Sequence, residues 1–471
     1  MGHESHEDGV EFDKAETTRI LSGEVVVDEC IHRCQIVATY EVPIDDVSIE
    51  IEFVDFGFGH ARLRHAAGVH QVAQSNGTCE VSSTRSTLRT HDQKRLMPPS
   101  FPSRRQRLAA AAAMRGAEIF VATQRPNQLY LLAGAQHEDP SCVISRGTCA
   151  AILFHHRGGQ VAETVVFPGI WISNACRDLL HDCEVVENGL ADPTAEEQLA
   201  HRLASMAPRR VLLDQLSDSL GQSIAKVAPS IELVVDDFVT TLLRRCKDEA
   251  DLVGLKRAAQ VADLGMQTAF ANVRPGVSCA DAIAVGTAAM LAAGAESVAM
   301  APTSGIGTGY LDSGEDPRRR IEEGDMVFID MGIWVHGYLG DMTRAAIVGT
   351  GSAEQQDLLA TVQEAYQRAS SLMVPGARGE EIYQTVVDLY APKGWAPYFI
   401  HHLSHGLGLG GDVPRVAADH AEILHVGDAL SCEPGCYIPG LGGARVENMI
   451  YVGDSGPVEL TTTPIDPELA S

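Results

Sequence analysis

The sequence lacks the features that mark membrane-spanning, secreted and nucleic-acid-binding proteins. No apolar run approaches the length of a membrane span, and the first sixteen residues, MGHESHEDGVEFDKAE, are too acidic and polar for a secretory signal. Basic residues are scarce: 36 Lys and Arg stand against 63 Asp and Glu, giving a formal charge of −27. A nucleic-acid-binding protein needs a basic face. We therefore expect neither a membrane nor a nucleic acid as partner.

A disulfide framework is also missing. Eleven cysteines are scattered over 471 residues, which is far from the density of a small secreted domain. The Cys-x3-Cys pairs Cys30/Cys34 and Cys432/Cys436 have no second pair at zinc-finger distance. We interpret these residues as ordinary reduced cysteines and expect a cytoplasmic location.

The length predicts two or three domains. Residues 1–96 contain strand-like stretches and a polar loop but no motif, and an appended module and an upstream extension of the reading frame both fit them. Residues 97–240 alternate helical and strand-like segments, which predicts an α/β domain. A helical pattern over residues 240–273 marks the junction, and residues 241–471 combine long helices with hairpins, which predicts an α+β domain.

Four carboxylates lie in the two hairpin-like stretches of the second domain. Asp330 and Asp341 belong to the first, and Glu433 and Glu447 to the second, each among strand-like apolar neighbours. Each one faces solvent or points inward and must be paired, because a bare buried charge is very costly. With His405, on a glycine-rich loop, they would form a donor set suited to two divalent ions such as Mn, Co, Fe or Zn. Spacing alone leaves both interpretations open.

The residues that flank these candidate ligands distinguish a metal site from carboxylates that face solvent. FIDMGIWVHGYLGDMTR resembles the Asp-x-Gly…Gly-Tyr-x-x-Asp-x-Thr-Arg signature of the pita-bread metallohydrolases, including its eleven-residue step between aspartates. SHGLGLG, CEPGCYIPG and ARVENMIYV resemble the His-Gly-x-Gly, Glu-Pro-Gly and Arg-x-Glu motifs of that family, in the family's order. The family includes methionine aminopeptidase, Xaa-Pro aminopeptidase, prolidase and creatinase. The resemblance extends from about residue 101 to 460 and implies a creatinase/prolidase-like α/β domain before the α+β pita-bread catalytic domain.

The resemblance also implies roles for residues. Asp330 would chelate one metal ion, Asp341 and Glu447 would bridge two, and His405 and Glu433 would hold the other. Glu433 would carry the proton of the attacking water. Arg445 would orient the carboxylates from behind the site. His401 would lie beside the substrate. His402 is interpreted as structural.

Two histidines usual in family peptidases are absent here. The one beyond the ligand loop corresponds to Gly411 or Asp412, depending on where one gap falls, and the upstream one would lie near Asp312. Such histidines donate hydrogen bonds to the scissile amide and its oxyanion. Asp312 and Asp412 would favour a cationic group or act as a base if they face the site, or they are solvated loop residues. Tyr310 is a further candidate for substrate binding.

Three functions follow. The first is a dinuclear-metal hydrolase of the Xaa-Pro aminopeptidase or prolidase type, acting on a small peptide. The second is a non-peptidase relative acting on a small, cationic metabolite, as a creatinase-like C–N hydrolase or a dimethylsulfoniopropionate-lyase-like enzyme would. The third is a binding module, like some histone-chaperone domains of this fold, although an intact ligand set argues against it. A homodimer is expected from the resemblance.

Overall fold

The structure is a computed structural model. It describes the backbone of residues 24–27, 36–39, 50–53 and 61–64, and then residues 103–132, 149–170, 172–180, 183–311, 316 and 318–469. The chain divides into two compact units, Met1–Ser103 and Arg104–Ser471. In the first unit, β1 (Glu24–Val27) pairs with β2 (Ile36–Thr39), and β3 (Glu50–Phe53) pairs with β4 (Ala61–Arg64); both pairs are antiparallel.

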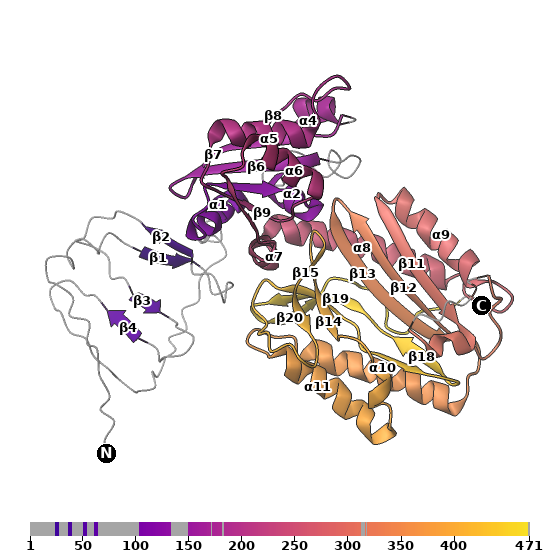
Figure 1. Ribbon diagram of the computed structural model, residues 1–471. Coiled ribbons are helices and arrows are strands. Elements are labelled where there is room, and N and C mark those ends of the chain that lie inside the picture. Colours follow the sequence, from indigo (N-terminus) through magenta and orange to yellow (C-terminus); the bar gives the residue numbers. More distant parts are fainter. Residues whose placement is uncertain are drawn as a thin grey trace, which may run out of the picture. The chain divides into compact units, whose positions relative to one another are not determined.

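The second unit begins with an α/β region built on a mixed sheet of order β10-β9-β5-β6-β7-β8 (Figure 1). Its strands are β5 (Ile119–Ala122), β6 (Cys149–Arg157), β7 (Gln160–Pro168), β8 (Glu184–Val185), β9 (Arg210–Leu213) and β10 (Glu232–Val235). The accompanying helices are α1 (Arg104–Met114), α2 (Arg125–Leu132), α4 (Ser173–Leu179), α5 (Ala195–Met206) and α6 (Asp218–Val227). The inward faces of β5, β6, β7 and β9 form one core with α5 and α6. The α/β region predicted from the alternating pattern is confirmed.

The remaining residues form an α+β region in which helices cover the outer faces of strands. The helices are α7 (Phe238–Arg245), α8 (Glu249–Phe270), α9 (Cys279–Ala292), α10 (Ala353–Ser371) and α11 (Gly379–Tyr390), with the short 3-10 helices η1 (Gly305–Gly309), η2 (Ala391–Lys393) and η3 (Ala396–Tyr398). The strands are β11 (Ser297–Ser304), β12 (Met326–Val335), β13 (Tyr338–Ile347), β14 (Ser404–Leu407), β15 (Gly411–Val416), β16 (Ala429–Cys432), β17 (Gly435–Ile438), β18 (Gly442–Arg445), β19 (Asn448–Gly453) and β20 (Gly456–Glu459).

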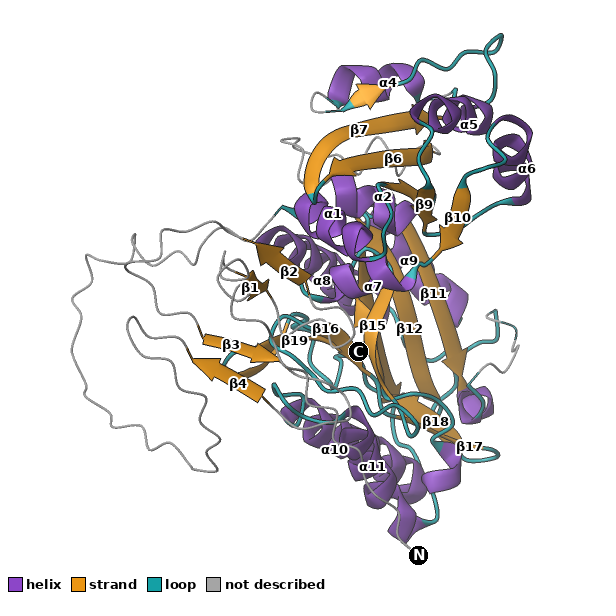
Figure 2. Cartoon of the chain, turned by 60° about the vertical axis from the view of Figure 1, so that its left-hand side comes forward, coloured by secondary structure: helices purple, strands orange, loops and turns teal. Residues whose placement is uncertain are grey.

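These strands form three sheets, with orders β11-β12-β13, β15-β14-β16-β19-β20 and β17-β18. Helix α8 packs on β12 and β13 and α9 on β11, whereas α10 and α11 lie together on the other side, against β18 and β15 (Figures 1 and 2). A bridge between Thr343 and Glu447 joins the first two sheets. The catalytic motifs predicted from the sequence therefore meet where the sheets converge.

One prediction about the elements is wrong. Residues 240–273 form two helices, α7 and α8, instead of one. The break comes at Asp248, whose side chain accepts a hydrogen bond from the Asp251 backbone, while the Asp251 side chain accepts one from the Asp248 backbone. This reciprocal pair is a capping box, which starts a new helix. Within the described residues, no helix is both long and apolar enough to cross a bilayer.

Candidate metal centre

The β12–β13 hairpin brings two of the predicted ligands onto one face. Its turn is made by His336 and Gly337, whose φ angles of 51° and 79° suit a two-residue turn that matches strand twist. In the resulting register Asp330 lies opposite Thr343, two residues from Asp341. Side chains two apart on a strand share a face. The eleven-residue step between the aspartates therefore makes them diagonal neighbours.

Glu447 joins this face from the neighbouring sheet. Its backbone N–H donates to the Thr343 carbonyl at 3.0 Å, and its Oε2 lies 2.7 Å from the Thr343 hydroxyl. Glu433 approaches from the end of β16, where its backbone N–H donates to the Leu403 carbonyl at 2.9 Å. The hydroxyl of Ser431 donates to Glu433 Oε1 at 2.9 Å. Backbone hydrogen bonds thus hold both glutamates in position.

His405 lies on β14 and faces the carboxylates. Its Nε2 is 3.3 Å from Asp341 Oδ2 and 3.6 Å from Glu433 Oε1. Its backbone N–H donates to the Ser431 hydroxyl at 3.1 Å, so the same serine supports both His405 and Glu433. The imidazole is therefore positioned between two carboxylates that come from different sheets.

These side chains line a pocket of about 580 Å³. Its polar wall contains the four carboxylates, three histidines and one arginine: Asp330, Asp341, Glu433, Glu447, His401, His402, His405 and Arg445. The remaining lining residues are mostly apolar: Ala301, Pro302, Thr303, Leu311 and Phe328. A pocket that combines charged and apolar lining residues suits a small molecule that has a polar reacting group.

The negative charge in the pocket exceeds the positive charge that balances it. Burial raises the pKa of Asp341 to about 6, with Asp330 and Glu433 adding to the effect against His405. Burial and the neighbouring carboxylates raise the pKa of Glu447 well above its usual range. Burial lowers the pKa of His405, but Asp341 and Glu433 outweigh it and bring that pKa to about 9. The raised pKa values mean that these groups hold protons, which partly neutralise the excess negative charge of the pocket.

Divalent cations fit this donor set. One possible group consists of Asp341, His405 and Glu447, whose ligand atoms all lie within 4.8 Å of one another. The second consists of His402, His405 and Glu433 under the same limit. Carboxylate oxygens with imidazole nitrogens are the ligands of Mn, Fe, Co and Zn in proteins. Four of the five predicted ligands therefore belong to groups of suitable geometry.

Asp330 is the fifth predicted ligand and belongs to neither group. Its Oδ2 accepts from Arg445 Nη2 at 2.6 Å and its Oδ1 from the Thr343 hydroxyl at 2.8 Å. Arg445 also donates from Nε to the Thr343 hydroxyl and from Nη1 to the Tyr437 hydroxyl, both at 3.0 Å. Arg445, itself part of the pocket lining, thus orients a carboxylate, and each Asp330 oxygen keeps a lone pair for a metal.

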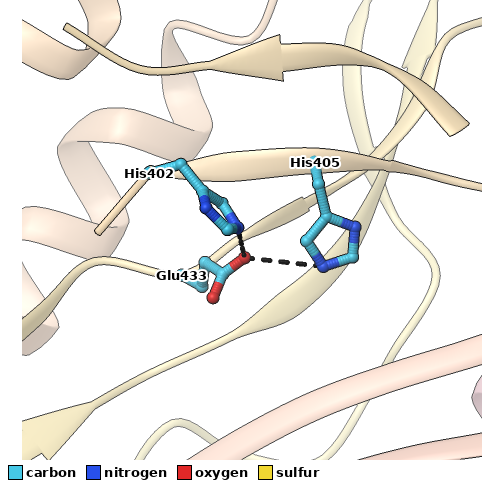
Figure 3. A group of neighbouring side chains, drawn as sticks. All are labelled: His402, His405 and Glu433. Atoms are coloured by element: carbon cyan, nitrogen blue, oxygen red, sulfur yellow. Dashed lines mark ion pairs between the residues drawn. The ribbon is translucent and has the colours of Figure 1, made fainter. Parts of the chain in front are cut away.

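His401 and His402 both line the pocket, and only His402 differs from what the sequence indicated. The Nδ1 of His401 lies 2.6 Å from the His402 carbonyl, an acceptor only, so Nδ1 carries the proton and Nε2 accepts from the Tyr437 hydroxyl at 3.1 Å. Burial lowers the pKa of His401 to about 4, which keeps it neutral. His401 therefore lines the pocket with both ring nitrogens engaged. His402, interpreted as structural, instead directs Nε2 at Glu433 Oε1, 3.3 Å away (Figure 3).

Two of the candidate substrate residues, Asp412 and Tyr310, do not line the pocket. Asp412 is buried with its carboxylate between Arg244 and Lys247, at 3.0 and 2.9 Å, and does not line the pocket. It is thus neither a substrate carboxylate nor a solvated loop residue, because two buried cations already neutralise it. Tyr310 is 49% exposed and is not part of the pocket lining. Asp312 lies outside the described residues.

Three supporting residues were missed by reasoning from the sequence. The Thr343 hydroxyl contacts two carboxylates, Tyr437 links Arg445 to His401, and Ser431 links His405 to Glu433. Thr343 lies inside the motif that identified Asp341, so its position could have been recognised. Tyr437 lies within the CEPGCYIPG stretch and Ser431 just before it, but the motif does not indicate which partners their hydroxyl groups have.

Comparison with known proteins agrees with this geometry. The family model described as Metallopeptidase family M24 matches residues 253–454. The Xaa-Pro dipeptidase of Pyrococcus furiosus is 31% identical over 234 residues, which are 49% of this chain and 66% of that enzyme. The uncharacterized peptidase YqhT of Bacillus subtilis is 31% identical over 291 residues, or 60% of this chain and 80% of that protein.

Solved structures extend the likeness to the α/β region. A Xaa-Pro dipeptidase from Bacillus anthracis superposes with a TM-score of 0.68 and 26% identity, covering 78% of this chain and 98% of that one. The prolidase from Pyrococcus horikoshii OT3 gives a TM-score of 0.67 at 23% identity and shares the fold, over 77% of this chain and 99% of that one. The predicted fold class, an α/β domain followed by a pita-bread α+β domain, is confirmed.

Proposed function

The chain belongs to metallopeptidase family M24, and we propose that it is a metal-dependent dipeptidase that hydrolyses the amide bond of small peptides, with Xaa-Pro dipeptides as the first substrates to test. The observation that carries the proposal is the convergence of Asp341, His405, Glu433 and Glu447 on one pocket with an excess of negative charge. The relatives named Xaa-Pro dipeptidase support the substrate class.

Two divalent ions, Mn, Co, Fe or Zn, would be held by Asp330, Asp341, His405, Glu433 and Glu447. Bound ions would supply a water of lowered pKa and positive charge for the oxygen of the scissile amide. The protein's own groups supply the proton transfer. Glu433 would accept the proton of the attacking water and pass it to the leaving nitrogen.

Glu433 is suited to this task by its surroundings. Burial alone raises the pKa of its carboxyl, but His402, Arg445 and His405 outweigh burial and lower that pKa overall. The carboxylate is therefore ionised and able to accept a proton at neutral pH. Thr343 and Arg445 hold the neighbouring carboxylates in position.

A cationic metabolite is a weaker candidate for the substrate. That interpretation relied on Asp312 and Asp412 facing the pocket, and Asp412 is neutralised by Arg244 and Lys247 instead. A homodimer and a reducing cytoplasmic location remain part of the proposal.

A substrate panel tests the function. The full chain would be loaded with Mn or Co and assayed against Xaa-Pro dipeptides, other dipeptides, tripeptides and onium metabolites. Dipeptide hydrolysis that requires the metal and is lost in Glu433→Gln supports the proposal. Metal-dependent turnover of onium compounds with none of dipeptides would contradict it.

A further inference from the structure

His402 occupies a position that its sequence context did not predict. Its Nε2 is 3.3 Å from Glu433 Oε1, and the Nε2 of His405 is 3.6 Å from the same oxygen (Figure 3). The two imidazole rings lie 5.6 Å apart, centre to centre, on one side of the pocket. Two histidine nitrogens therefore face one carboxylate oxygen.

We propose that His402 is an additional metal ligand, binding through Nε2 the same divalent ion that His405 and Glu433 would hold. The inference rests on the proposed function, since it requires a metal in this pocket. Two donor atoms that bind one ion at about 2.1 Å lie roughly 3.0–3.4 Å apart at coordination angles of about 90–109°. The two distances to Glu433 Oε1 are close to this range before any ion is bound.

The backbone around His402 is held in place by hydrogen bonds. The next residue, Leu403, is fully buried; its N–H donates to the Val416 carbonyl and its own carbonyl accepts from the Glu433 N–H. The carbonyl of His402 accepts from His401 Nδ1 at 2.6 Å. These bonds fix the backbone from which the His402 side chain reaches Glu433.

The other two histidines of the stretch make the assignment specific. His401 uses both nitrogens within the protein, on the His402 carbonyl and the Tyr437 hydroxyl, and has no lone pair left for a metal. His405 alone would give the donor set a single imidazole. With His402 the ion near Glu433 would have two imidazoles, which shifts preference toward Zn or Co over Mn.

The experiment counts imidazole ligands on bound Zn. The full chain is loaded with Zn, the metal content is measured, and X-ray absorption fine structure gives the number of imidazole nitrogens per protein. We expect two in the wild type and in His401→Gln, and one in His402→Gln and in His405→Gln. Calorimetric titration with Co should show affinity in His402→Gln reduced by at least about 100-fold. His420→Gln, a histidine outside the pocket that contacts Asp419, is the matched control and should bind as the wild type does.

The outcomes separate the inference from the function. One imidazole per protein in metal-loaded wild type would overturn the assignment of His402 and leave the dipeptidase proposal standing. No uptake of Zn or Co by the wild type would overturn both. If His402→Gln does not fold, the imidazole counts of the wild type and His401→Gln decide the question without it.

Discussion

Thr343 has one hydroxyl proton but faces two carboxylates. Its Oγ1 lies 2.8 Å from Asp330 Oδ1 and 2.7 Å from Glu447 Oε2, and it also accepts from Arg445 Nε. It can donate to only one of the two carboxylates, so the second contact requires a protonated carboxyl group. Burial and like charges raise the pKa of Glu447, which makes it the group that carries this proton. A metal that binds Glu447 must therefore displace a proton.

Thr343→Val tests the importance of that hydroxyl. The change keeps the shape of a fully buried side chain but leaves Arg445 Nε and one carboxylate without their partner. Loss of such a supporting hydrogen bond typically weakens metal binding by about 10- to 100-fold. We expect this range in a Co titration. Thr385→Val, which removes an exposed hydroxyl that donates to the Glu381 carbonyl, should leave Co affinity unchanged.

The pKa shifts predict how pH affects the metal-free protein. The pKa of His405 is raised from 6.5 to about 9, so its stabilising contribution is complete below pH 6.5 and is lost as pH rises through 9. The pKa of Asp341 is raised from 3.8 to about 6, so stability also falls as pH rises across that interval. Both groups bind more protons in the folded state.

Thermal unfolding after chelator treatment should therefore show a midpoint that falls between pH 6.5 and 9.5. His405→Gln should flatten this decline, because it removes the group that titrates there. Added Mn or Co should raise the midpoint most at the high end of the range, since metal replaces the displaced protons. A midpoint that rises with pH in the metal-free protein would contradict the assigned shifts.

At the scale of the elements, the residues at the end of α7 link strand β15 to the α/β region. Arg244 and Lys247, at and just beyond its end, enclose Asp412 of β15, with all three side chains at most 8% exposed. Arg244 Nη1 also donates to Asn127 of α2, whose Nδ2 donates to Asp214 at 2.7 Å. The strand that pairs with the His405 strand is therefore tied to the α/β region through buried charges.

Asp412→Asn should destabilise the protein rather than alter substrate preference. Removing one partner of a buried ion pair leaves uncompensated charge and typically costs about 3–5 kcal/mol. Urea unfolding should show a loss of this order in the free energy of unfolding. Asp454→Asn, in an exposed turn, should change it by less than about 0.5 kcal/mol. A KM increase specific to cationic peptides in Asp412→Asn, with stability unchanged, would restore Asp412 as a substrate residue.

Some of these features have a local signal in the sequence and could be predicted from it, and others have none. The eleven-residue step between Asp330 and Asp341 encodes its own geometry, because a two-residue turn and strand alternation fix the register locally. The break between α7 and α8 also had a local signal in the Asp248–Asp251 pair. The partners of Asp412 had none, since Arg244 lies 168 residues away and only the folded chain brings them together.

At the scale of the whole molecule, two compact units divide the chain after Ser103. The catalytic motifs and the contacts of the pocket all lie in the second unit. The Bacillus anthracis structure is matched over 98% of its length by 78% of this chain. The domain limits 1–96, 97–240 and 241–471 remain predictions.

A variant that begins at Met97 should fold and retain its metals. It keeps Arg104, which forms ion pairs with Asp248 and Asp251 at the start of α8. We expect its Co stoichiometry and its dipeptide turnover to equal those of the full chain. Insoluble protein, or a turnover reduced more than about tenfold at equal metal content, would show that residues 1–96 contribute to the catalytic unit.

The cationic side chains at and just beyond the end of α7 also fix the two ends of one chain segment. Arg244 and Lys247 hold Asp412, and Arg245 holds Asp428 at 2.7 and 2.8 Å, so one short stretch of chain fixes both ends of residues 412–428. Between them the turn at Ala418 and Asp419 is exposed. Because lengthening a loop with fixed ends adds little entropic cost, this turn is where the chain should accept an inserted peptide or a protease cut while the His405 strand stays in position.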